Sequence, residues 1–573
     1  MLRKRGLWSA VLGLGVTVTM LLSACGPTAS TSGGGIKNGG SLVDGISQEP
    51  SSLMIGQSTQ AFAALVEQSI WAPLIYTDDK YNLDAGLLTQ VPSGANGGDV
   101  VTGTTEKITL KLRANLKWSD GQALTSDDVA FAIATYRDAT YGAKTGFDSL
   151  KEIATVETPD KLTTVITLND VDVAFLASSL ADNFVFSPLP KHHYSSMTPA
   201  QIAADFQPAV TSGPFTVSER VKGDHITVVK NTNYYQAGKP HLNQITFKFF
   251  PDANTIVTAL QAGQVDSAYF LPVSSADVLK NIPGYKFFQP KQGGSWEAWY
   301  FNLSNSILAD IKVREALAMS FDPNTEVTQI QHGNAAVTCD DGEATFVHEP
   351  SLVQTGGFCA YGPDQHVGLD VAGAKTLLAG DGWTAGSDGI LVKDGTKLSL
   401  RISTTSGRQY RLDSEALAKA AWKAIGVDIN IVNHPSSDLF GPVLFPSDTK
   451  YQKSNDQWDI AEFANNQSTP DPDNHTIWSS DQVPPAGGSN LTYYNNSSVD
   501  ALEKQQLTQT NVNDRKATFH QIHVQILKDI PTFYLYAALD ISEYKNTLHN
   551  YSPIGGGGVE DWNVWDWYLG AAQ

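Results

Sequence analysis

The sequence is poor in cysteine and in basic residues, and it lacks any long apolar run beyond its N-terminal segment. It contains three cysteines, and 39 lysines and arginines stand against 59 aspartates and glutamates, a formal net charge of −20. This shortage of positive charge excludes nucleic acid as an expected partner, because nucleic-acid binding depends on neutralising phosphates. It also opposes electrostatic adhesion to anionic lipid. Without a further apolar run of spanning length, we expect no internal transmembrane helix.

Motifs of common hydrolases are missing too. No His-Glu-x-x-His zinc motif occurs, and residues 293–297 (Gly-Gly-Ser-Trp-Glu) lack the second glycine of a nucleophile elbow. The acidic and histidine residues within 470–475 imitate a metal cluster, but the interleaved prolines favour a rigid turn. We therefore expect no enzyme activity, no metal and no cofactor. A secreted hydrolase is the alternative, and turnover of a peptide or glycoside by the pure protein would reveal it.

The N-terminus has the pattern of an export signal. Three basic residues within 3–5 precede an apolar stretch over 7–22, and Ser23-Ala24 stand directly before Cys25. This order predicts a secretory signal over residues 1–24. The cysteine resembles that of a bacterial lipobox, which implies cleavage before Cys25 and attachment of lipid to it. Residues 25–40 are small and polar and should form a flexible tether. The alternative is an uncleaved membrane anchor.

Two cysteines remain if Cys25 carries lipid. An even pair in an exported protein predicts one disulfide, between Cys339 and Cys359. Their surroundings are polar and rich in glycine, which favours a bridged surface loop. The alternative is a pair of free buried thiols.

The remaining chain alternates helical and strand patterns. With 573 residues in all, the sequence is too long for one core and should divide into two or three domains. A helix from Asp252 to Leu260, ended by Gly263, precedes an apolar run over 265–270. A second helix expected from Asp413 ends at Gly426 and precedes an alternating strand. Helix, glycine and strand in this order predict an α/β fold.

Six stretches, taken in chain order, resemble family 5 of the solute-binding proteins of ABC importers, the large peptide-binding class. Each stretch alone is weak, but six in the family's order are specific. They are residues 108–128, 211–216, 230–266, 301–317, 377–383 and 458–473. The resemblance implies an α/β, two-lobed periplasmic-binding-protein-like fold (class II type) with an extra small domain and a cleft between the lobes. Closure of the lobes around a solute would be the mechanism.

The same resemblance implies a domain map. The first lobe takes residues 41–80, 205–305 and 532–573, the extra small domain takes 81–204, and the second lobe takes 306–531. The hinge crossings are expected near 302–306 and 531–534. The protein would be a monomer on the extracytoplasmic side of the cell membrane, at the cell surface or in the periplasm. It would deliver its ligand to ABC permease subunits for transmembrane transport.

The ligand expected from the resemblance is a peptide. In peptide binders of the family, an aspartate placed before the Asp-Pro pair holds the peptide's amino group, and the corresponding position before Asp471 is Ser468. This departure puts recognition of a free amine in doubt, unless Glu297 or Glu462 supplies the charge. An oligosaccharide is the alternative ligand, and a sensor or adhesin with the same fold is the alternative function. The neutral neighbours are Asn465, Asn466 and Gln467.

Further candidate ligand residues lie in two other places. Trp296, Glu297 and Trp299 precede the Phe-Asn hinge motif, and aromatic faces near a hinge suit a ligand cleft. Gln57 and Thr59 follow the first strand, where relatives approach their ligand. The alternative for the two tryptophans is packing at the hinge. The ligand set expected from the sequence is Gln57, Thr59, Trp296, Glu297, Trp299, Asn465, Asn466, Gln467, Ser468 and Asp471.

Overall fold

The structure is a computed structural model, and it describes residue 36 and residues 38–572, apart from positions 59, 144–147, 182–185, 251, 291–294, 343–344, 467–469, 486–487, 539–540 and 555–560. The signal segment and Cys25 lie outside the described residues. All the elements below belong to one compact unit, Lys37–Gln573. Within the described part of the chain, no helix combines the length and the apolar character needed to cross a membrane.

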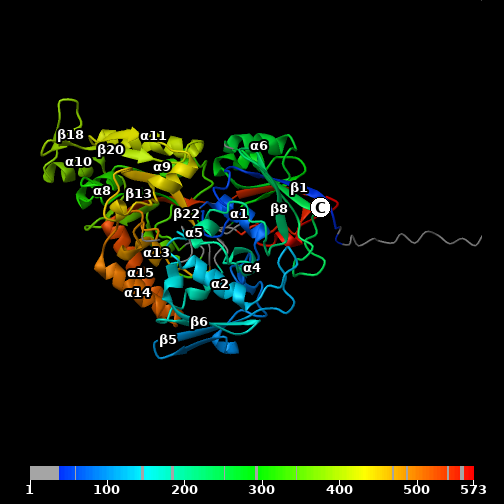
Figure 1. Cartoon of the computed structure of the whole chain (residues 1–573). Coiled ribbons are helices and arrows are strands. Elements are labelled where there is room, and N and C mark those ends of the chain that lie inside the picture. Colours follow the sequence, from blue (N-terminus) through cyan, green and yellow to red (C-terminus); the bar gives the residue numbers. More distant parts are fainter. Residues whose placement is uncertain are drawn as a thin grey trace, which may run out of the picture. The chain divides into compact units, whose positions relative to one another are not determined.

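A seven-stranded sheet is built from the beginning, the middle and the end of the sequence. Its order is β12-β24-β11-β1-β10-β9-β8, and Figure 1 shows its strands in blue, green and red. Strand β1 runs parallel to both β10 and β11. The strands are β1 (Ser41–Ile46), β8 (Phe215–Val221), β9 (His225–Lys230), β10 (Gln244–Phe249), β11 (Ser267–Leu271), β12 (Tyr285–Phe288) and β24 (Ile541–Lys545).

Helix α6 (Ala253–Gln261) follows the pattern read from the sequence. The side chain of Asp252 accepts a hydrogen bond from Asn254 N and caps the helix. Gly263 follows with φ at 70°, a left-handed conformation that favours glycine. Apolar residues of α6 and β11 form one hydrophobic cluster on this sheet. The predicted helix, glycine and strand are therefore confirmed here.

A five-stranded sheet forms the centre of a second core. Its order is β21-β20-β22-β13-β23. Trp299 of β13 is fully buried and packs its ring against Trp422 at 4.8 Å and Phe533 at 5.5 Å. The strands are β13 (Ser295–Phe301), β20 (Ser399–Ser403), β21 (Asp428–Ile431), β22 (Ile460–Asn466) and β23 (Thr532–Ala538). Its longer helices are α8 (Ile311–Met319), α10 (Val371–Gly380), α11 (Gln409–Ala424), α14 (Ser497–Leu507) and α15 (Val512–Asp529).

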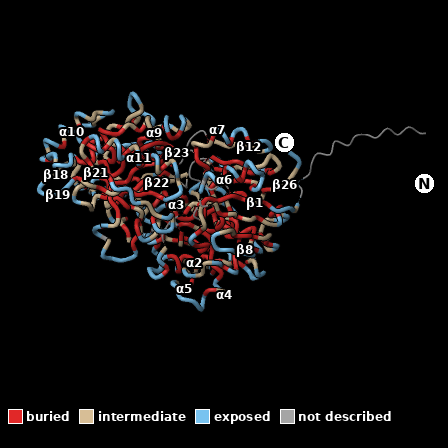
Figure 2. The backbone as a smooth tube through the Cα atoms, turned by 90° about the horizontal axis from the view of Figure 1, so that it is seen from above, coloured by how far each residue is buried: buried red, intermediate tan, exposed pale blue. Residues whose placement is uncertain are grey.

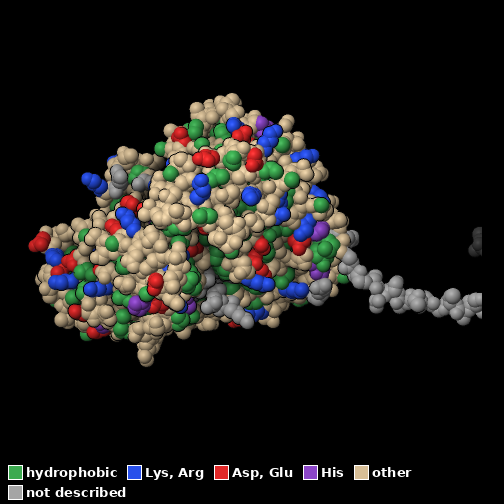
Figure 3. Space-filling view, turned by 90° about the horizontal axis from the view of Figure 1, so that it is seen from below, with side chains coloured by type: hydrophobic (Ala, Val, Ile, Leu, Met, Phe, Trp, Pro, Cys, Tyr) green, Lys and Arg blue, Asp and Glu red, His purple; other side chains and the backbone are tan. Residues whose placement is uncertain are grey.

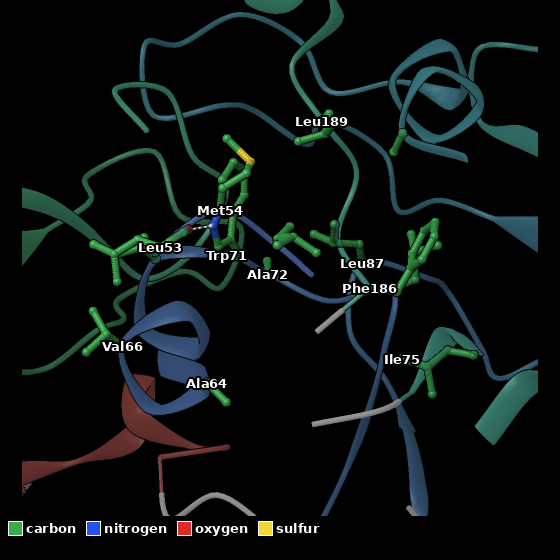
Figure 4. Packing of buried hydrophobic residues seen from close by; sticks show 14 of the residues in the cluster. Leu53, Met54, Ala64, Val66, Trp71, Ala72, Ile75, Leu87, Phe186 and Leu189 are labelled. Carbon is green, nitrogen blue, oxygen red and sulfur yellow. Dashed lines mark hydrogen bonds between the residues drawn. The ribbon is translucent and has the colours of Figure 1, made fainter. Parts of the chain in front are cut away.

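A four-stranded antiparallel sheet, β4-β5-β7-β6, lies in the region expected to be the small domain. Its apolar side chains share one core with the seven-stranded sheet and helix α1 (Ala61–Ile70). Figure 4 shows part of this shared core, where Trp71 donates from Nε1 to Leu53 O at 3.1 Å. The elements are β4 (Asp99–Thr102), β5 (Thr105–Lys111), β6 (Ile153–Asp160), β7 (Thr163–Leu168) and α2 (Ser126–Tyr136).

The smaller elements lie outside these three sheets. Figure 2 shows buried segments near β22 and β1. Strand β18, in contrast, is half-buried and β19 is exposed. The short strands are β2 (Ile75–Thr77), β3 (Leu83–Ala85), β14 (Val353–Gln354), β15 (Phe358–Tyr361), β16 (His366–Val367), β17 (Thr384–Ala385), β18 (Leu391–Lys393), β19 (Thr396–Lys397), β25 (Leu548–His549) and β26 (Tyr568–Leu569). The short helices used below are α3 (Phe175–Leu180), α9 (Pro323–Gln329) and α13 (His475–Trp478).

The chain passes between the two large sheets at other points than expected. Strands β13 and β23 pair with each other in the five-stranded sheet, whereas the expected map gave residues 295–305 and 532–538 to the first lobe. The crossings therefore fall between β12 and β13 and between β23 and β24, not near 302–306 and 531–534. The pairing of strands so far apart in sequence is set by side-chain packing, which a local pattern does not contain.

The disulfide between Cys339 and Cys359 is present, with Cα atoms 5.5 Å apart. Both cysteines are buried, so the bridge lies beneath the surface of its loop. The aromatic C-terminal run docks on the core, because Trp567 is fully buried and Trp562 stacks on Tyr76.

Candidate functional site

Three of the predicted ligand residues meet at one end of the five-stranded sheet. Strands β13 and β22 are antiparallel, and Trp296 is paired with Asn465 and Ser295 with Asn466. The Ser295 hydroxyl donates to Asn466 Oδ1 at 2.6 Å. At this end β13 begins, β22 ends and β23 ends, next to both chain crossings. The site is thus formed by Trp296, Asn465 and Asn466 beside the two connections to the seven-stranded sheet.

Two buried donors on one face of β13 have no partner in hydrogen-bond geometry among the described residues. They are Trp296 Nε1 and the Tyr300 hydroxyl, and each side chain is 2% exposed. Both residues belong to the same face of β13, and the Tyr300 ring stacks on Phe463 at 4.2 Å. An unmet buried donor costs free energy and needs an explanation, such as a bound group. The Tyr300 hydroxyl interacts with the side chains of Asn465 and Trp296, so these three polar groups lie together on this face.

Glu297 lies on the opposite face of β13 and is committed to another side chain. Its two carboxylate oxygens accept from Arg411 Nε at 2.7 Å and Nη2 at 3.1 Å. The two side chains are 1% and 8% exposed, so the pair is buried. Arg411 also donates to Thr405 Oγ1 at 2.9 Å. The charge of Glu297 is therefore met within the core in this structure.

Trp299 and Glu462 also face the core. Trp299 donates from Nε1 to Glu462 Oε2 at 3.0 Å, and both residues are fully buried. Burial raises the pKa of Glu462 well above its usual value, and the nearby carboxyls of Glu326 and Glu297 raise it further. For Trp299, the alternative of packing describes its surroundings. Neither carboxyl, Glu297 or Glu462, is exposed to meet a ligand's amino group.

Asp471 anchors the Asp-Pro-Asp turn rather than standing open. It accepts a bidentate pair of hydrogen bonds from Arg515, at 2.6 and 2.7 Å. Asp473 binds His475 Nδ1 at 2.7 Å and accepts from Gln506 Nε2 at 2.6 Å. Burial opposes the charge of His475, but Asp473 outweighs it and raises the pKa of this imidazole to about 10. The turn is thereby fixed to helices α14 and α15.

The other predicted residues are divided between described and undescribed positions. Gln57 is half-buried and donates from Nε2 to Tyr141 O at 2.9 Å. Thr59, Gln467 and Ser468 lie outside the described residues. Among the described residues, no group of three or more histidine, cysteine, aspartate or glutamate side chains is placed to hold a metal ion.

Comparison with known proteins decides the family. The family model for bacterial extracellular solute-binding proteins, family 5 Middle, matches residues 91–484, which is more than half of the chain. The chain belongs to this family. It is similar to the oligopeptide-binding protein AppA of Bacillus subtilis, with 27% identity over 542 residues that cover 92% of each protein.

Solved structures of family 5 proteins confirm the expected two-lobed fold class. The structure of AppA from Bacillus subtilis in complex with a nonapeptide aligns with a TM-score of 0.83 and 24% identity, over 94% of this chain and 100% of AppA. NikZ from Campylobacter jejuni in complex with Ni(L-His) aligns with a TM-score of 0.75 and 21% identity, over 92% of this chain and 99% of NikZ. The same fold therefore hosts ligands of very different chemistry.

Sequence reasoning missed the residues of this family 5 protein that join the two large cores. Arg408 caps α11 and donates from Nη2 to Ser47 Oγ, just after β1, at 2.9 Å. Its guanidinium also lies 5.8 Å from the centre of the Phe62 ring of α1. Ser436 donates to Gln48 Oε1 at 2.9 Å. These partners lie hundreds of positions apart, and no local signal marks them.

Proposed function

We propose that this family 5 protein captures peptides outside the cytoplasm by closing two lobes around them, and delivers them to an ABC permease. The first lobe consists of the seven-stranded and four-stranded sheets, which share one core. The second lobe is built on the five-stranded sheet, from β13 to β23. Lipid on Cys25 would hold the protein at the membrane through the tether of residues 25–40.

The observation that carries this proposal is the full-length similarity to an oligopeptide-binding protein, together with two separate hydrophobic cores, one in each proposed lobe. Ligand that touches both lobes favours the closed state by its differential affinity. The buried donors of Trp296 and Tyr300, with the amide side chains of Asn465 and Asn466, suit the carbonyl groups of a peptide backbone.

Recognition of the peptide's amino group is the weakest match to the family pattern. We propose that Ser468 occupies the position of the amine-binding aspartate, so the natural ligand is held without a buried counter-charge there. Replacing Ser468→Asp is expected to strengthen binding of free-amine peptides and to leave N-acetylated ones unchanged. Calorimetry with both forms of one nonapeptide makes the comparison, and equal affinities for the variant and the wild type would contradict the mapping.

The role of Trp296 can be tested with a matched control. Replacing Trp296→Phe keeps an aromatic ring but removes the N–H, and about tenfold weaker peptide binding is expected for the loss of one buried hydrogen bond. Trp383→Phe is the control, because its Nε1 is also buried without a partner but lies in the α10–β17 connection, where no predicted ligand residue stands. Equal affinity for the Trp296 variant and the wild type would remove it from the site.

An oligosaccharide is the second candidate ligand, favoured by the side-chain amides of Asn465 and Asn466 beside the ring of Trp296. Mass spectrometry of small molecules that remain bound after gentle purification separates the two classes. A bound peptide supports the proposal. A bound sugar, or a thermal shift with cello- or xylo-oligosaccharides and none with peptides, refutes it.

A further inference from the structure

A second contact between the proposed lobes lies at the turn between β7 and α3. The backbone N–H of Val173 donates to Leu507 O, at the end of α14, at 2.8 Å. The neighbouring Asp172 is 5% exposed, although it belongs to a surface turn of the small domain. Its carboxylate accepts from Ala174 N at 3.0 Å. The small domain therefore contacts the second lobe through the Val173 amide, next to the buried carboxyl group of Asp172.

The charges that face Asp172 are mostly of its own sign. Within the small domain, Glu106 accepts from Asp172 N at 2.8 Å and neighbours Asp99. Across the junction, the charged neighbours of Asp172 belong to the Asp-Pro-Asp turn, to α13 and to α15. They are Asp471, Asp473, His475 and Arg515.

The two second-lobe cations near Asp172, Arg515 and His475, already bind other side chains. Arg515 is held by the bidentate contact with Asp471 and by Gln506 Oε1, at 2.6 Å from Nη2. His475 is held by Asp473 at 2.7 Å. Among the described residues, no cation forms an ion pair with Asp172. The second lobe thus presents two carboxylates and two cations that already pair with each other, and no cation is left for Asp172. Burying a charged Asp172 at this junction is costly, whereas burying a protonated one is not.

We infer that this junction is an acid-favoured latch, in which the small domain docks on the second lobe, and so closes the proposed cleft, more readily when Asp172 carries a proton. The inference rests on the proposed closure of the lobes. It adds a pH dependence to closure that comes from the protein and not from the ligand.

The direction of the effect follows from proton linkage. Burial first, and Asp473 second, raise the pKa of Asp172 to about 7, although His475 opposes them. An exposed carboxyl in the open state has an ordinary pKa of about 3.9. Docking is therefore coupled to the uptake of a proton at pH values between these two pKa values. The resulting stabilisation of the docked state is lost as the pH rises through the docked pKa of Asp172. The ratio of docked to undocked protein should be about tenfold higher at pH 6 than at pH 8.

Hydrogen exchange at Val173 tests the latch without any ligand, since this amide is bonded across the junction. Exchange of the segment around Val173 is measured by mass spectrometry on the full-length protein in detergent and corrected for the intrinsic pH dependence. About tenfold greater protection is expected at pH 6 than at pH 8. Protection that is equal at the two pH values would overturn the inference with the wild-type protein alone.

Two variants test whether Asp172 is the group that causes the pH dependence of protection. Asp172→Asn keeps the acceptor for Ala174 N but no longer titrates, so its protection should be high and the same at both pH values. Asp170→Asn is the charge-matched control, because Asp170 is exposed two positions away, and it should keep the wild-type pH dependence. A pH dependence that survives in Asp172→Asn would reject Asp172 as the switch. Failure to bind peptide would refute the proposed function but leave these exchange results standing, so the two failures are distinguishable.

Discussion

Replacing Arg411→Met should destabilise the second lobe strongly. The change leaves the carboxylate of Glu297 in a site where it is 1% exposed, with its two charge-assisted hydrogen bonds removed. Breaking a buried ion pair from one side costs about 3–5 kcal/mol, because the remaining charge has lost its partner. Glu326 and Glu462 lie close enough to add their own charges to that of Glu297. The site therefore has no alternative cation for Glu297 among these neighbours.

Urea unfolding of the ligand-free protein measures this cost, and a double-mutant cycle separates the pair from simple loss of packing. The double variant Glu297→Gln with Arg411→Met removes both charges and should recover most of the lost free energy of unfolding. Lys397→Met is the control, since Lys397 and Asp388 form an exposed pair 2.6 Å apart and its loss should be within experimental error. A loss below about 1 kcal/mol for Arg411→Met, or a double variant no more stable than the single one, would refute the reasoning.

Three further predictions concern other contacts. Cys359→Ser should lower the free energy of unfolding in urea by about 3 kcal/mol, because the Cys339 bridge closes a loop of roughly 20 residues in the unfolded chain. If reductant leaves the free energy of unfolding of the wild type unchanged, that result argues against the bridge. His523 is buried, and its Nε2 lies 2.8 Å from Asp341 Oδ1. Burial alone lowers the pKa of this imidazole, but Asp341 and the other acidic neighbours raise it to about 10. Its stabilising effect should be complete below the unfolded pKa near 6.5 and lost as pH rises through about 10; thermal melts of His523→Gln should lack that decline, and a parallel decline in both proteins would count against it. Arg408→Gln should weaken peptide binding equally at pH 6 and pH 8 in calorimetry, because its contact with Ser47 contains no titrating carboxyl; a pH-dependent loss would contradict this.

Local patterns predicted the elements that depend on neighbouring residues. The cap at Asp252 and Gly263 after α6 were found where the capping pattern placed them. Helix α11, in contrast, does not begin where the sequence predicted. The helix begins at Gln409, and Asp413 lies inside it, accepting from Gln409 Nε2 at 2.9 Å. An aspartate that caps one helix can equally bond a side chain one turn away within another.

The contacts that build the site were less accessible to sequence reasoning. The resemblance to family 5 made Trp296 and Asn465 candidate ligand residues, and the strand register pairs them. It did not show that Glu297 would turn toward Arg411, because strand alternation gives two faces without saying which one meets the ligand. The pairing of Arg411 with Glu297 and of Arg515 with Asp471 joins residues 114 and 44 positions apart. Such pairs depend on three-dimensional packing and leave no local signal.

Surface charge agrees with the composition. On the face drawn in Figure 3, acidic and basic side chains lie interspersed, and no large cluster of one sign stands out. Mixed charge of this kind limits non-specific association through the face that is drawn.

The distance between the lobes in solution tests the central claim most directly. Spin labels at Lys222→Cys, in the β8–β9 turn, and Lys419→Cys, on α11, report on the first and second proposed lobes; both positions are exposed. Cys25→Ser leaves the bridged pair as the other cysteines. Pulsed dipolar spectroscopy should give a broad distance distribution without ligand and a shorter, narrower one with a saturating random nonapeptide library. An identical distribution with and without bound peptide would contradict capture by closure.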